Sequence, residues 1–597
     1  MLLTANHRGW FLLLLAVLLS FGWAGTCSGQ ENFDQQQNDN QPENPPGRIA
    51  RLSYLKGNVS FLRAGVNEWS AAALNFPVTT GDRIYTEKGA RAELEAGSAT
   101  ARMAGSTDLV VTALDDQIMQ LGLEQGTLRI TVYQLSSGET VEIDTPNGSV
   151  TFSEPGTCRF DVDPSGNQSS VSVYSGAIEI TGGGLSQRVE AGQAVRMTGQ
   201  NQVEVESIPI PPADDFDRWS EERDRRLASS RSREYVSPAT PGYDDLDSYG
   251  HWQVVAEYGP VWFPPVAVGW VPYRFGHWVW IDPWGWSWIE DEPWGFCAFH
   301  YGRWALIGSV WGWVPGPIVP LPVYTPALVA FIGGSGFSVG IGVNLVGWFP
   351  LGPGEPFFPW YHHDREYLRL VNVTNVRNVT NITNIINVTN INNVHYAYKT
   401  VAPTVVPANV LSSGQPVVHN VVRVPPQQLA RAPIAPHPPV NPTLRAAIPG
   451  RPVRPPPVKS QPLASAIGRP QVASPSTRPG AREPAGLVGR PAAPEAGGVR
   501  PIPAVPRERP APPATHAGVP RTMEPPPLPA RRPPPLPPIP FVQRRQAMVD
   551  HPGRPLEPAQ TQNLRVGRPV GPMRDVEFPP HTAPIVRAAP PPRHERR

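Results

Sequence analysis

The sequence predicts a mainly β protein: a β-sandwich or short β-solenoid, a short linker helix, a small tryptophan-rich β-repeat module and a long disordered proline-rich tail. Three observations support this prediction. Short alternating segments fill residues 48–207, tryptophans recur at a fixed spacing within residues 248–360, and 50 of the 77 prolines lie after residue 400. Because proline lacks an amide donor and resists both helices and central strands, we expect the folded modules within the first 400 residues.

The N-terminus carries the features of a secretory signal. An almost wholly apolar run extends from Phe11 to Phe21 and is followed by small residues, which predicts a signal peptide over residues 1–29. The run is short for a membrane span of about 20 residues, although a retained anchor stays open. Residues 30–47 are predicted to be a disordered leader. We therefore expect an exported protein of the periplasm or cell surface.

Two cysteines remain after the signal region, Cys158 and Cys297. In an oxidising compartment they can pair. They lie in different predicted domains, so two buried free thiols are an equal alternative.

Residues 48–207 read as short strands separated by turns. Arg129–Tyr133 alternates polar and apolar side chains, which predicts a strand with one buried face. Val171–Tyr174 and Ala177–Ile180 are predicted to form a hairpin across a Ser-Gly turn. Thr151–Val162 is predicted to be a second strand pair across a Pro-Gly turn. Short strands at this spacing are typical of a sandwich or a solenoid.

The same region resembles a FecR-type domain. The motifs that carry the resemblance are, in chain order, Gly57-Asn58-Val59, Thr80-Gly81-Asp82-Arg83-Ile84, Leu123 to Leu128, Asp144-Thr145-Pro146, Gly156-Thr157 with Phe160-Asp161-Val162, Tyr174-Ser175-Gly176 and Glu190-Ala191-Gly192-Gln193. The resemblance implies periplasmic sensing passed to an anti-sigma or sigma partner. Because the only apolar run has no cytoplasmic segment before it, we expect a standalone domain that binds a ligand or partner.

A linker over residues 208–247 is predicted to contain a helix. Residues 214–234 lack proline and glycine, and acidic residues at the start are followed by arginines, which suits the helix dipole. Charged side chains cover nearly every face. We expect a connecting helix, not a membrane-binding one.

Residues 249–313 hold 12 of the 18 tryptophans in a repeat of about 26 residues. Tyr249-Gly250-His251-Trp252, Phe275-Gly276-His277-Trp278 and Tyr301-Gly302-Arg303-Trp304 begin the copies, and a second tryptophan follows ten residues later at Trp262 and Trp288. The third copy, with Trp311-Gly312-Trp313, is shifted by one or two positions. Such a period predicts stacked small β units. Each buried indole removes about 150–250 Å² from water, so one interpretation is that the rings form the core.

The other interpretation is that some rings are exposed platforms for sugar faces or proline-rich peptide. Twelve rings are more than so small a module is expected to bury. The candidate ligand-binding residues are Trp280, Trp284, Trp286 and Trp288, with Asp282, Glu290, Asp291 and Glu292 supplying carboxylates for hydroxyls or cations.

This module also resembles an uncharacterised Trp/Pro-rich domain that accompanies FecR domains in exported bacterial proteins. The residues that carry the resemblance are Asp245-Leu246-Asp247, Val271-Pro272-Tyr273-Arg274, Glu292-Pro293-Trp294-Gly295, His300 to Trp304 and Gly347 to Pro353. The resemblance implies no known activity.

Residues 361–400 contain seven triplets of a branched apolar residue, a variable residue and asparagine, beginning at Val373. A period of three suits a threefold extended helix or one edge of a solenoid, docked on the tryptophan module or on another copy.

Residues 401–597 are predicted to form the disordered tail. They carry 26 Lys and Arg against 9 Asp and Glu, a balance of +17, whereas the first 400 residues carry 25 against 41, a balance of −16. We expect the tail to meet an anionic partner, either an envelope surface or the body of the protein itself.

No catalytic motif occurs, so we expect no enzyme, no cofactor and no metal site. His251, His277 and His300 are interpreted as repeat positions. The leading hypothesis is an exported binding or scaffolding protein. Its expected partner is an envelope protein, a cell-wall glycan or another copy of the chain, without nucleic acid. The alternatives are a self-associating structural component of the envelope and a periplasmic sensory subunit of a FecR-like system.

Overall fold

The computed structural model describes residues 44–182, 184–200, 202–316, 318–333, 344–373, 394–458, 536–549 and 552–567, all within one compact unit. The predicted signal peptide, most of the predicted leader and nearly all of the triplet repeat lie outside the described residues.

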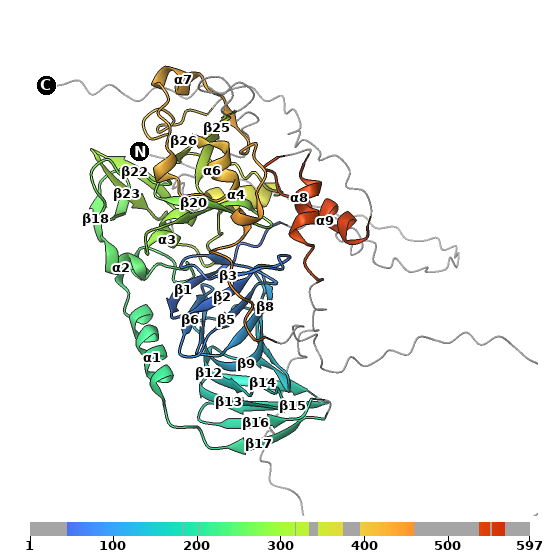
Figure 1. The fold of residues 1–597 in the computed structure, drawn as a ribbon. Helices are drawn as coiled ribbons and strands as arrows, with labels where there is room; N and C mark the ends of the chain where they lie inside the picture. Colours follow the sequence, from blue (N-terminus) through green and yellow to red (C-terminus); the bar gives the residue numbers. More distant parts are fainter. Residues whose placement is uncertain are drawn as a thin grey trace, which may run out of the picture. The chain divides into compact units, whose positions relative to one another are not determined.

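The FecR-like domain contains the first seventeen strands (Figure 1). Their bounds are β1 Ala50–Lys56, β2 Val59–Leu62, β3 Trp69–Ala71, β4 Pro77–Val78, β5 Arg83–Thr86, β6 Arg91–Glu95, β7 Ala99–Met103, β8 Asp108–Leu114, β9 Ile118–Val132, β10 Thr140–Thr145, β11 Gly148–Phe152, β12 Gly156–Val162, β13 Gln168–Ser175, β14 Ala177–Gly182, β15 Leu185–Glu190, β16 Ala194–Thr198 and β17 Glu204–Ile208.

These strands form two sheets that share β9. The first sheet has the order β4-β1-β6-β7-β9-β12-β13-β16-β17. The second has the order β3-β2-β5-β8-β9-β10-β11-β14-β15. The first residues of β9 lie between β8 and β10 in the second sheet, and its last residues lie between β7 and β12 in the first sheet. The alternating apolar side chains of both sheets, such as Phe160 and Ile180, belong to one hydrophobic core. The predicted mainly β fold is confirmed, and the two sheets form a sandwich.

Both predicted hairpins are instead corners at which the chain passes from one sheet to the other. β13 pairs with β12 and β16 in the first sheet, whereas β14 pairs with β11 and β15 in the second. A Cβ added to Gly156 would lie 2.1 Å from the carbonyl oxygen of Ser175, and one added to Gly176, at φ +76°, would lie 2.4 Å from that of Pro155. The two corners therefore contact each other through glycines. The predicted pairings are wrong because alternation fixes the faces of a strand but not its neighbour.

The linker contains the expected helix, α1 (Asp215–Ala228), which lies alongside the strands of the first sheet (Figure 1). Asp214 caps it by accepting hydrogen bonds from the N–H groups of Phe216 and Asp217, at 2.8 and 2.9 Å. The side chain of Asp217 accepts in return from the N–H of Asp214, which completes a capping box. The short helices η1 (Arg231–Glu234) and α2 (Asp245–Tyr249) follow.

Each copy of the tryptophan repeat forms one β-hairpin. The strands are β18 His251–Val255 with β19 Gly259–Phe263, β20 Gly276–Ile281 with β21 Gly285–Glu290, and β22 Arg303–Ile307 with β23 Val310–Val314. In every hairpin two tryptophans lie directly opposite each other: Trp252 with Trp262, Trp278 with Trp288, and Trp304 with Trp313. The third hairpin turns over two residues instead of three, which explains its shifted spacing. β19 and β23 join the first and third hairpins into one sheet, and the second hairpin is a separate sheet.

A further four-stranded sheet follows, in the order β26-β25-β24-β27. Its strands are β24 Val329–Ile332, β25 Leu345–Pro350, β26 Thr404–Pro407 and β27 Ile434–Ala435. The helix α3 (Gly295–His300) precedes this sheet in the sequence, and the helix α4 (Arg365–Val373) lies between β25 and β26.

Residues 401–458 correct the prediction of a tail that is disordered throughout. They supply β26 and β27 and the helices α6 Ala408–Ser412, η3 Val418–Asn420, α7 Pro426–Arg431 and η4 Leu444–Ala447. Val405, Val406 and Leu411 are almost fully buried. Proline is tolerated here because β26 is an edge strand that ends at Pro407.

After 77 residues outside the described part, the chain is described again over residues 536–549 and 552–567, which we call the docking segment. It contains α8 (Phe541–Ala547) and α9 (Pro558–Arg565), drawn in red in Figure 1. Ile539, Phe541 and Met548 of this segment are buried.

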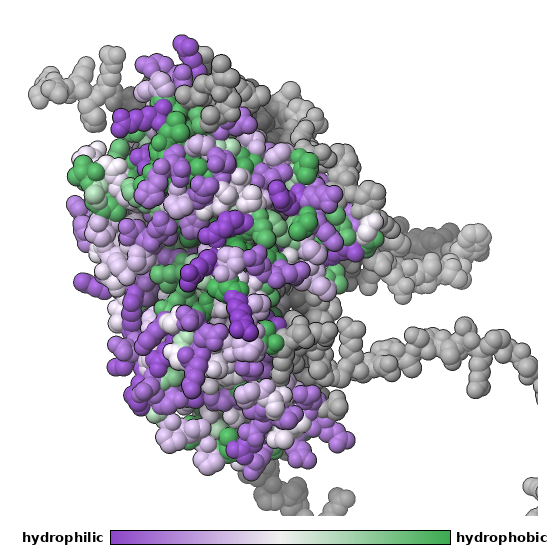
Figure 2. Space-filling model, viewed as in Figure 1, coloured by the Kyte–Doolittle hydropathy of each residue, from purple (hydrophilic) through white to green (hydrophobic). Residues whose placement is uncertain are grey.

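Cys158 and Cys297 are both buried and unpaired, as in one of the two alternatives for these residues. Among the described residues, no helix is both long and apolar enough to cross a membrane. Figure 2 shows hydrophilic residues over much of the visible face, with smaller hydrophobic areas between them.

Candidate functional site

The four tryptophans predicted as a ligand platform are core residues. The exposed fractions of Trp280, Trp284, Trp286 and Trp288 are 1%, 1%, 0% and 0%. Of the 12 rings in residues 249–313, all except Trp252 are buried, so the structure departs from the expectation of several exposed rings. The rings are buried because they pack edge to face on one another; those of Trp280 and Trp286, for example, lie 5.4 Å apart.

The four predicted carboxylates do not converge on one site. Asp282 lies in the turn between β20 and β21, where it accepts a hydrogen bond from Trp280 Nε1 at 3.2 Å. Glu290, at the far end of the hairpin, is buried and accepts from Trp288 Nε1 at 2.8 Å. Asp291 and Glu292 follow it and are exposed. The eight predicted residues are therefore divided between the two ends of the hairpin.

The turn end of the second hairpin is covered by the protein's own proline-rich tail. Arg544 of α8 forms an ion pair with Asp282. Trp286 Nε1 donates a hydrogen bond to the carbonyl oxygen of Val440 at 3.0 Å. A Cβ added to Gly285 would lie 3.2 Å from both Pro555 and the Trp280 ring, so proline and indole meet there. We call Trp280, Asp282, Gly285 and Trp286 the hairpin tip.

The docking segment also contacts the FecR-like domain. Phe541 N–H donates to the Gly65 carbonyl oxygen at 2.7 Å, and Arg544 Nη2 donates to that of Ala64 at 3.2 Å. Gly65 lies in the loop between β2 and β3. Since Arg544 bonds both Ala64 and Asp282, one side chain connects the FecR-like domain to the hairpin tip.

A second tail segment adds to the edge strand β3. Ala71 N–H donates to the Arg451 carbonyl oxygen, and Val453 N–H donates to that of Trp69, both at 2.9 Å. Pro452 lies between them, opposite Ser70. Its missing N–H costs nothing in this register, because the residues on either side make the hydrogen bonds. This is strand addition by an extended proline-containing segment.

A different charged site lies between α1 and the first sheet. Arg102, Arg129 and Arg159 lie directly opposite one another on β7, β9 and β12 and form what we call the arginine row. Like charges in this register are destabilising unless they are neutralised. One face of α1 neutralises them through an acidic stripe spaced by three and four residues: Asp214, Asp217, Glu221 and Asp224.

The ion pairs of this site are short and partly buried. Asp217, at 1% side-chain exposure, bonds Arg129 at 2.9 Å and Arg159 at 2.6 Å. Arg102 bonds Asp224 at 2.7 Å. Glu93 of β6 pairs with Arg102 and with Arg223 of α1. Burial alone would raise the pKa of Glu93, but the hydrogen bond from Arg223 and the charge of Arg102 lower that pKa to about 2.

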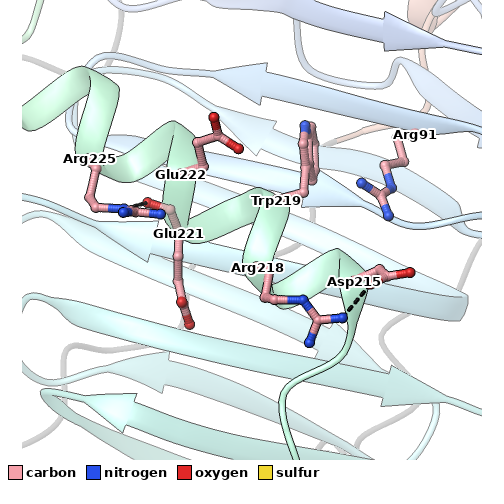
Figure 3. Close-up of a pocket in the computed structure, with 7 residues that line it drawn as sticks. All are labelled: Arg91, Asp215, Arg218, Trp219, Glu221, Glu222 and Arg225. Carbon is pink, nitrogen blue, oxygen red and sulfur yellow. Dashed lines mark hydrogen bonds and ion pairs between the residues drawn. The ribbon is translucent and has the colours of Figure 1, made fainter.

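An open hollow of about 660 Å³ lies along α1 and the start of β6, and is drawn in Figure 3. Its lining consists of Arg91, Asp215, Arg218, Trp219, Glu221, Glu222 and Arg225. Figure 3 shows the ion pair between Arg218 and Asp215 within the helix. The mixture of charges gives this hollow no single preference for an anion or a cation.

Sequence reasoning named the acidic body as one of two alternative partners for the tail, but it did not identify the arginine row or the residues of the tail contacts. The 3-4-3 spacing of the acidic residues in 214–224 was a readable signal for a helix face that binds cations. Nothing local marks Arg544 or Val440 as partners of the hairpin. Within the described part of the chain, no group of three or more His, Cys, Asp or Glu side chains is placed to hold a metal ion.

Two family models match the chain. Residues 82–179 match the family described as FecR protein, and residues 243–355 match a family of unknown function, DUF6600. No curated protein matches the sequence.

Two solved structures are similar to part of the chain, both described as crystal structures of a candidate anti-sigma factor from Parabacteroides distasonis ATCC 8503. They are 12% and 14% identical to the chain, and both have a TM-score of 0.20. The similarity covers 24% and 23% of this chain, which spans 64% and 62% of the length of those two.

The first match begins one residue before β5 and ends in β14, inside the sandwich, and the second begins before α2 and includes all three tryptophan hairpins. The chain therefore contains a FecR domain followed by a DUF6600 domain.

Proposed function

We propose that this chain is an exported, non-enzymatic binding and scaffolding protein of the bacterial envelope, which holds proline-rich, arginine-bearing segments at the hairpin tip and at β3. One observation carries the proposal: two separate parts of its own proline-rich tail occupy these two places. The apolar run at Phe11–Phe21 supports export.

The chemistry of the two places fits such a ligand. A carboxylate such as Asp282 binds a guanidinium group through charge-assisted hydrogen bonds. The indole edge of Trp280 offers apolar contact to a proline ring. The edge of β3 offers backbone groups to an extended strand, and proline-rich chains adopt extended conformations at low entropic cost.

Long-range charge favours the same ligand. The first 400 residues carry a balance of −16, and the tail carries +17. Opposite net charges accelerate encounter and favour cationic segments over acidic ones.

The test uses the full chain with Arg544→Glu, which places a carboxylate against Asp282 and releases the docking segment. A synthetic peptide of residues 536–567 is titrated into it while intrinsic tryptophan fluorescence is followed. We expect a saturable change in the variant and a weaker one in the wild type, whose site is already occupied. A flat titration in the folded variant would sink the proposal.

Two control peptides give the specificity. The peptide with Arg544→Glu should bind about tenfold more weakly or worse, because a charge-assisted hydrogen bond contributes about 1.5–3 kcal/mol. The peptide with Arg545→Glu should bind like the unchanged one, since Arg545 is the exposed neighbour on α8.

A second candidate function is that of a periplasmic sensory subunit, which the FecR match favours. In that case the FecR domain transmits the state of the bound segment to a regulator carried on another polypeptide. Co-purification of a membrane-spanning regulator with the full chain, lost on deletion of the FecR domain from the gene, would support this candidate over a passive scaffold.

A further inference from the structure

We infer that the docking segment of one copy of this chain can occupy the hairpin tip of a second copy, so that the protein assembles by reciprocal exchange of residues 536–567. This inference rests on the proposed function, because the hairpin tip must first be a binding site for such a segment. Beyond the proposed function, the partner is a second copy of the same chain.

The docking segment contacts the body through its own side chains and backbone groups. Its described contacts with the body include the ion pair of Arg544, the hydrogen bond from Phe541 N–H and the burial of Ile539, Phe541 and Met548. A second copy of the segment would make the same contacts with the same side chains. The energy of the bound interface is therefore the same within one chain and between two chains, and domain exchange is a low-cost route to a dimer.

The chain between the body and the docking segment is long enough for the segment to bind either its own molecule or a neighbouring one. The last described residue before the docking segment is Val458, and 77 residues separate it from residue 536. At about 3.4 Å per residue, a fully extended chain of this length spans up to about 260 Å. That reach far exceeds the diameter of one folded domain, so the segment can arrive from a neighbouring molecule.

What decides between the two arrangements is concentration. Binding within one chain is favoured by the effective concentration of the tethered segment, which falls as the tether lengthens. Binding between chains is favoured by the number of neighbouring copies. The opposite charges of body and tail, −16 and +17, attract the tail of one copy to the body of the next. We therefore expect the exchange to increase with protein concentration and to weaken with salt.

A charge exchange at the ion pair tests this directly in the full chain. Asp282→Arg and Arg544→Asp each place like charges together, both within the chain and between identical copies. In an equimolar mixture, the Arg at 282 of one variant can pair with the Asp at 544 of the other, and the remaining Asp282 can pair with the remaining Arg544. We expect the mixture to form a heterodimer in sedimentation experiments, with a dissociation constant at least about tenfold below that of either variant alone.

Two controls distinguish exchange from misfolding and from a general effect of the changed charge. The double variant Asp282→Arg with Arg544→Asp restores the pair within one chain and should behave like the wild type. Asp282→Arg mixed with Arg545→Asp should associate no more strongly than the wild type, because the exposed Arg545 does not face residue 282. A mixture of Asp282→Arg and Arg544→Asp that remains monomeric would overturn the inference. If the peptide of residues 536–567 still binds in that case, the proposed function stands and only the exchange fails.

A second measurement needs no substitution in the body. The wild type at rising concentration should sediment increasingly as a dimer, and excess peptide of residues 536–567 should return it to a monomer. A dimer that the peptide does not dissolve would assign the association to another surface. A monomer at every soluble concentration would equally contradict the exchange.

Discussion

Glu290 is a buried carboxyl among the tryptophans of the second hairpin. Burial raises the pKa of this carboxyl well above its ordinary value of 4.5, the charges of Asp291 and Glu292 raise it further, and the hydrogen bond from Trp288 opposes the shift. The group is therefore neutral in the folded protein at a pH where it is ionised in the unfolded chain.

Because of this raised pKa, the free energy of unfolding falls as pH rises. The neutral carboxyl contributes fully below about pH 4.5, and its contribution is lost as pH rises towards the folded pKa. We expect the free energy of unfolding to fall from pH 5 to pH 8 in urea titrations. Glu290→Gln should reduce this slope and raise stability at pH 8 by about 1–3 kcal/mol. Asp291→Asn removes only one of the smaller causes of the shift and should reduce the slope much less, and an unchanged slope in Glu290→Gln would contradict the assignment.

At the scale of elements, α1 contacts the first sheet through partly buried ion pairs. Asp217 faces two arginines and is almost fully buried, whereas Asp215 in the same first turn has a side-chain exposure of 86% and pairs with Arg218. Removing one partner of a buried ion pair leaves an uncompensated charge, while an exposed pair contributes little.

Asp217→Asn should therefore destabilise the protein by about 3 kcal/mol, and Asp215→Asn by about 0.5 kcal/mol or less. Asparagine keeps an acceptor for the capping box, so the comparison isolates the charge. Urea unfolding gives the free energies, and hydrogen exchange should show faster exchange within α1 for Asp217→Asn alone. Equal effects of the two variants would mean that the helix is held by its apolar residues instead.

Two glycines distinguish the effect of backbone strain from the effect of crowding: Gly176, at the corner between β13 and β14, and Gly184, in the turn between β14 and β15. Gly176 and Gly184 both have positive φ, at +76° and +86°. A Cβ on Gly176 would meet the Pro155 carbonyl oxygen at 2.4 Å, whereas one on Gly184 would meet nothing within 4 Å.

Gly184→Ala should therefore cost about 1–2 kcal/mol of unfolding free energy, from the left-handed backbone alone. Gly176→Ala should cost distinctly more, because the two corners must also move apart. Thermal unfolding of both variants measures the difference. Similar losses would show that the corners separate easily.

At the scale of the whole described unit, the docking segment joins the loop between β2 and β3 of the sandwich to the DUF6600 domain. Arg544 bonds Asp282 of the hairpin and the Ala64 carbonyl oxygen of the sandwich, and 451–453 adds to β3. Loss of Arg544 should release the segment without unfolding either domain, because each domain has its own buried strands.

Arg544→Glu should accelerate proteolysis within residues 541–548 by about tenfold, since cleavage follows the population of the released segment. Mass spectrometry of the fragments identifies the site. Arg545→Glu, which changes the charge by the same amount on the exposed side of α8, should leave the rate unchanged. If both variants are cleaved alike, the ion pair with Asp282 does not hold the segment.

Local patterns alone determined a large part of this structure. The alternation in residues 48–207 predicted strands, the acidic start and missing glycine and proline in 214–234 predicted α1, and the 26-residue period predicted small β units with a degenerate third copy. These features depend on residues a few positions apart, such as the capping pair Asp214 and Asp217. Such interactions are therefore readable without the fold.

Only the tertiary structure decided which elements meet. An alternating strand followed by a Gly turn fits a hairpin and a sandwich corner equally well, and the contact of Gly156 with Ser175 selects the corner. Trp286 donates its hydrogen bond to Val440, and Asp282 pairs with Arg544, 262 residues away. The sequence determined the local conformations, because they arise from near neighbours. The structure determined the pairings, because their energy comes from contacts between residues that no local pattern connects.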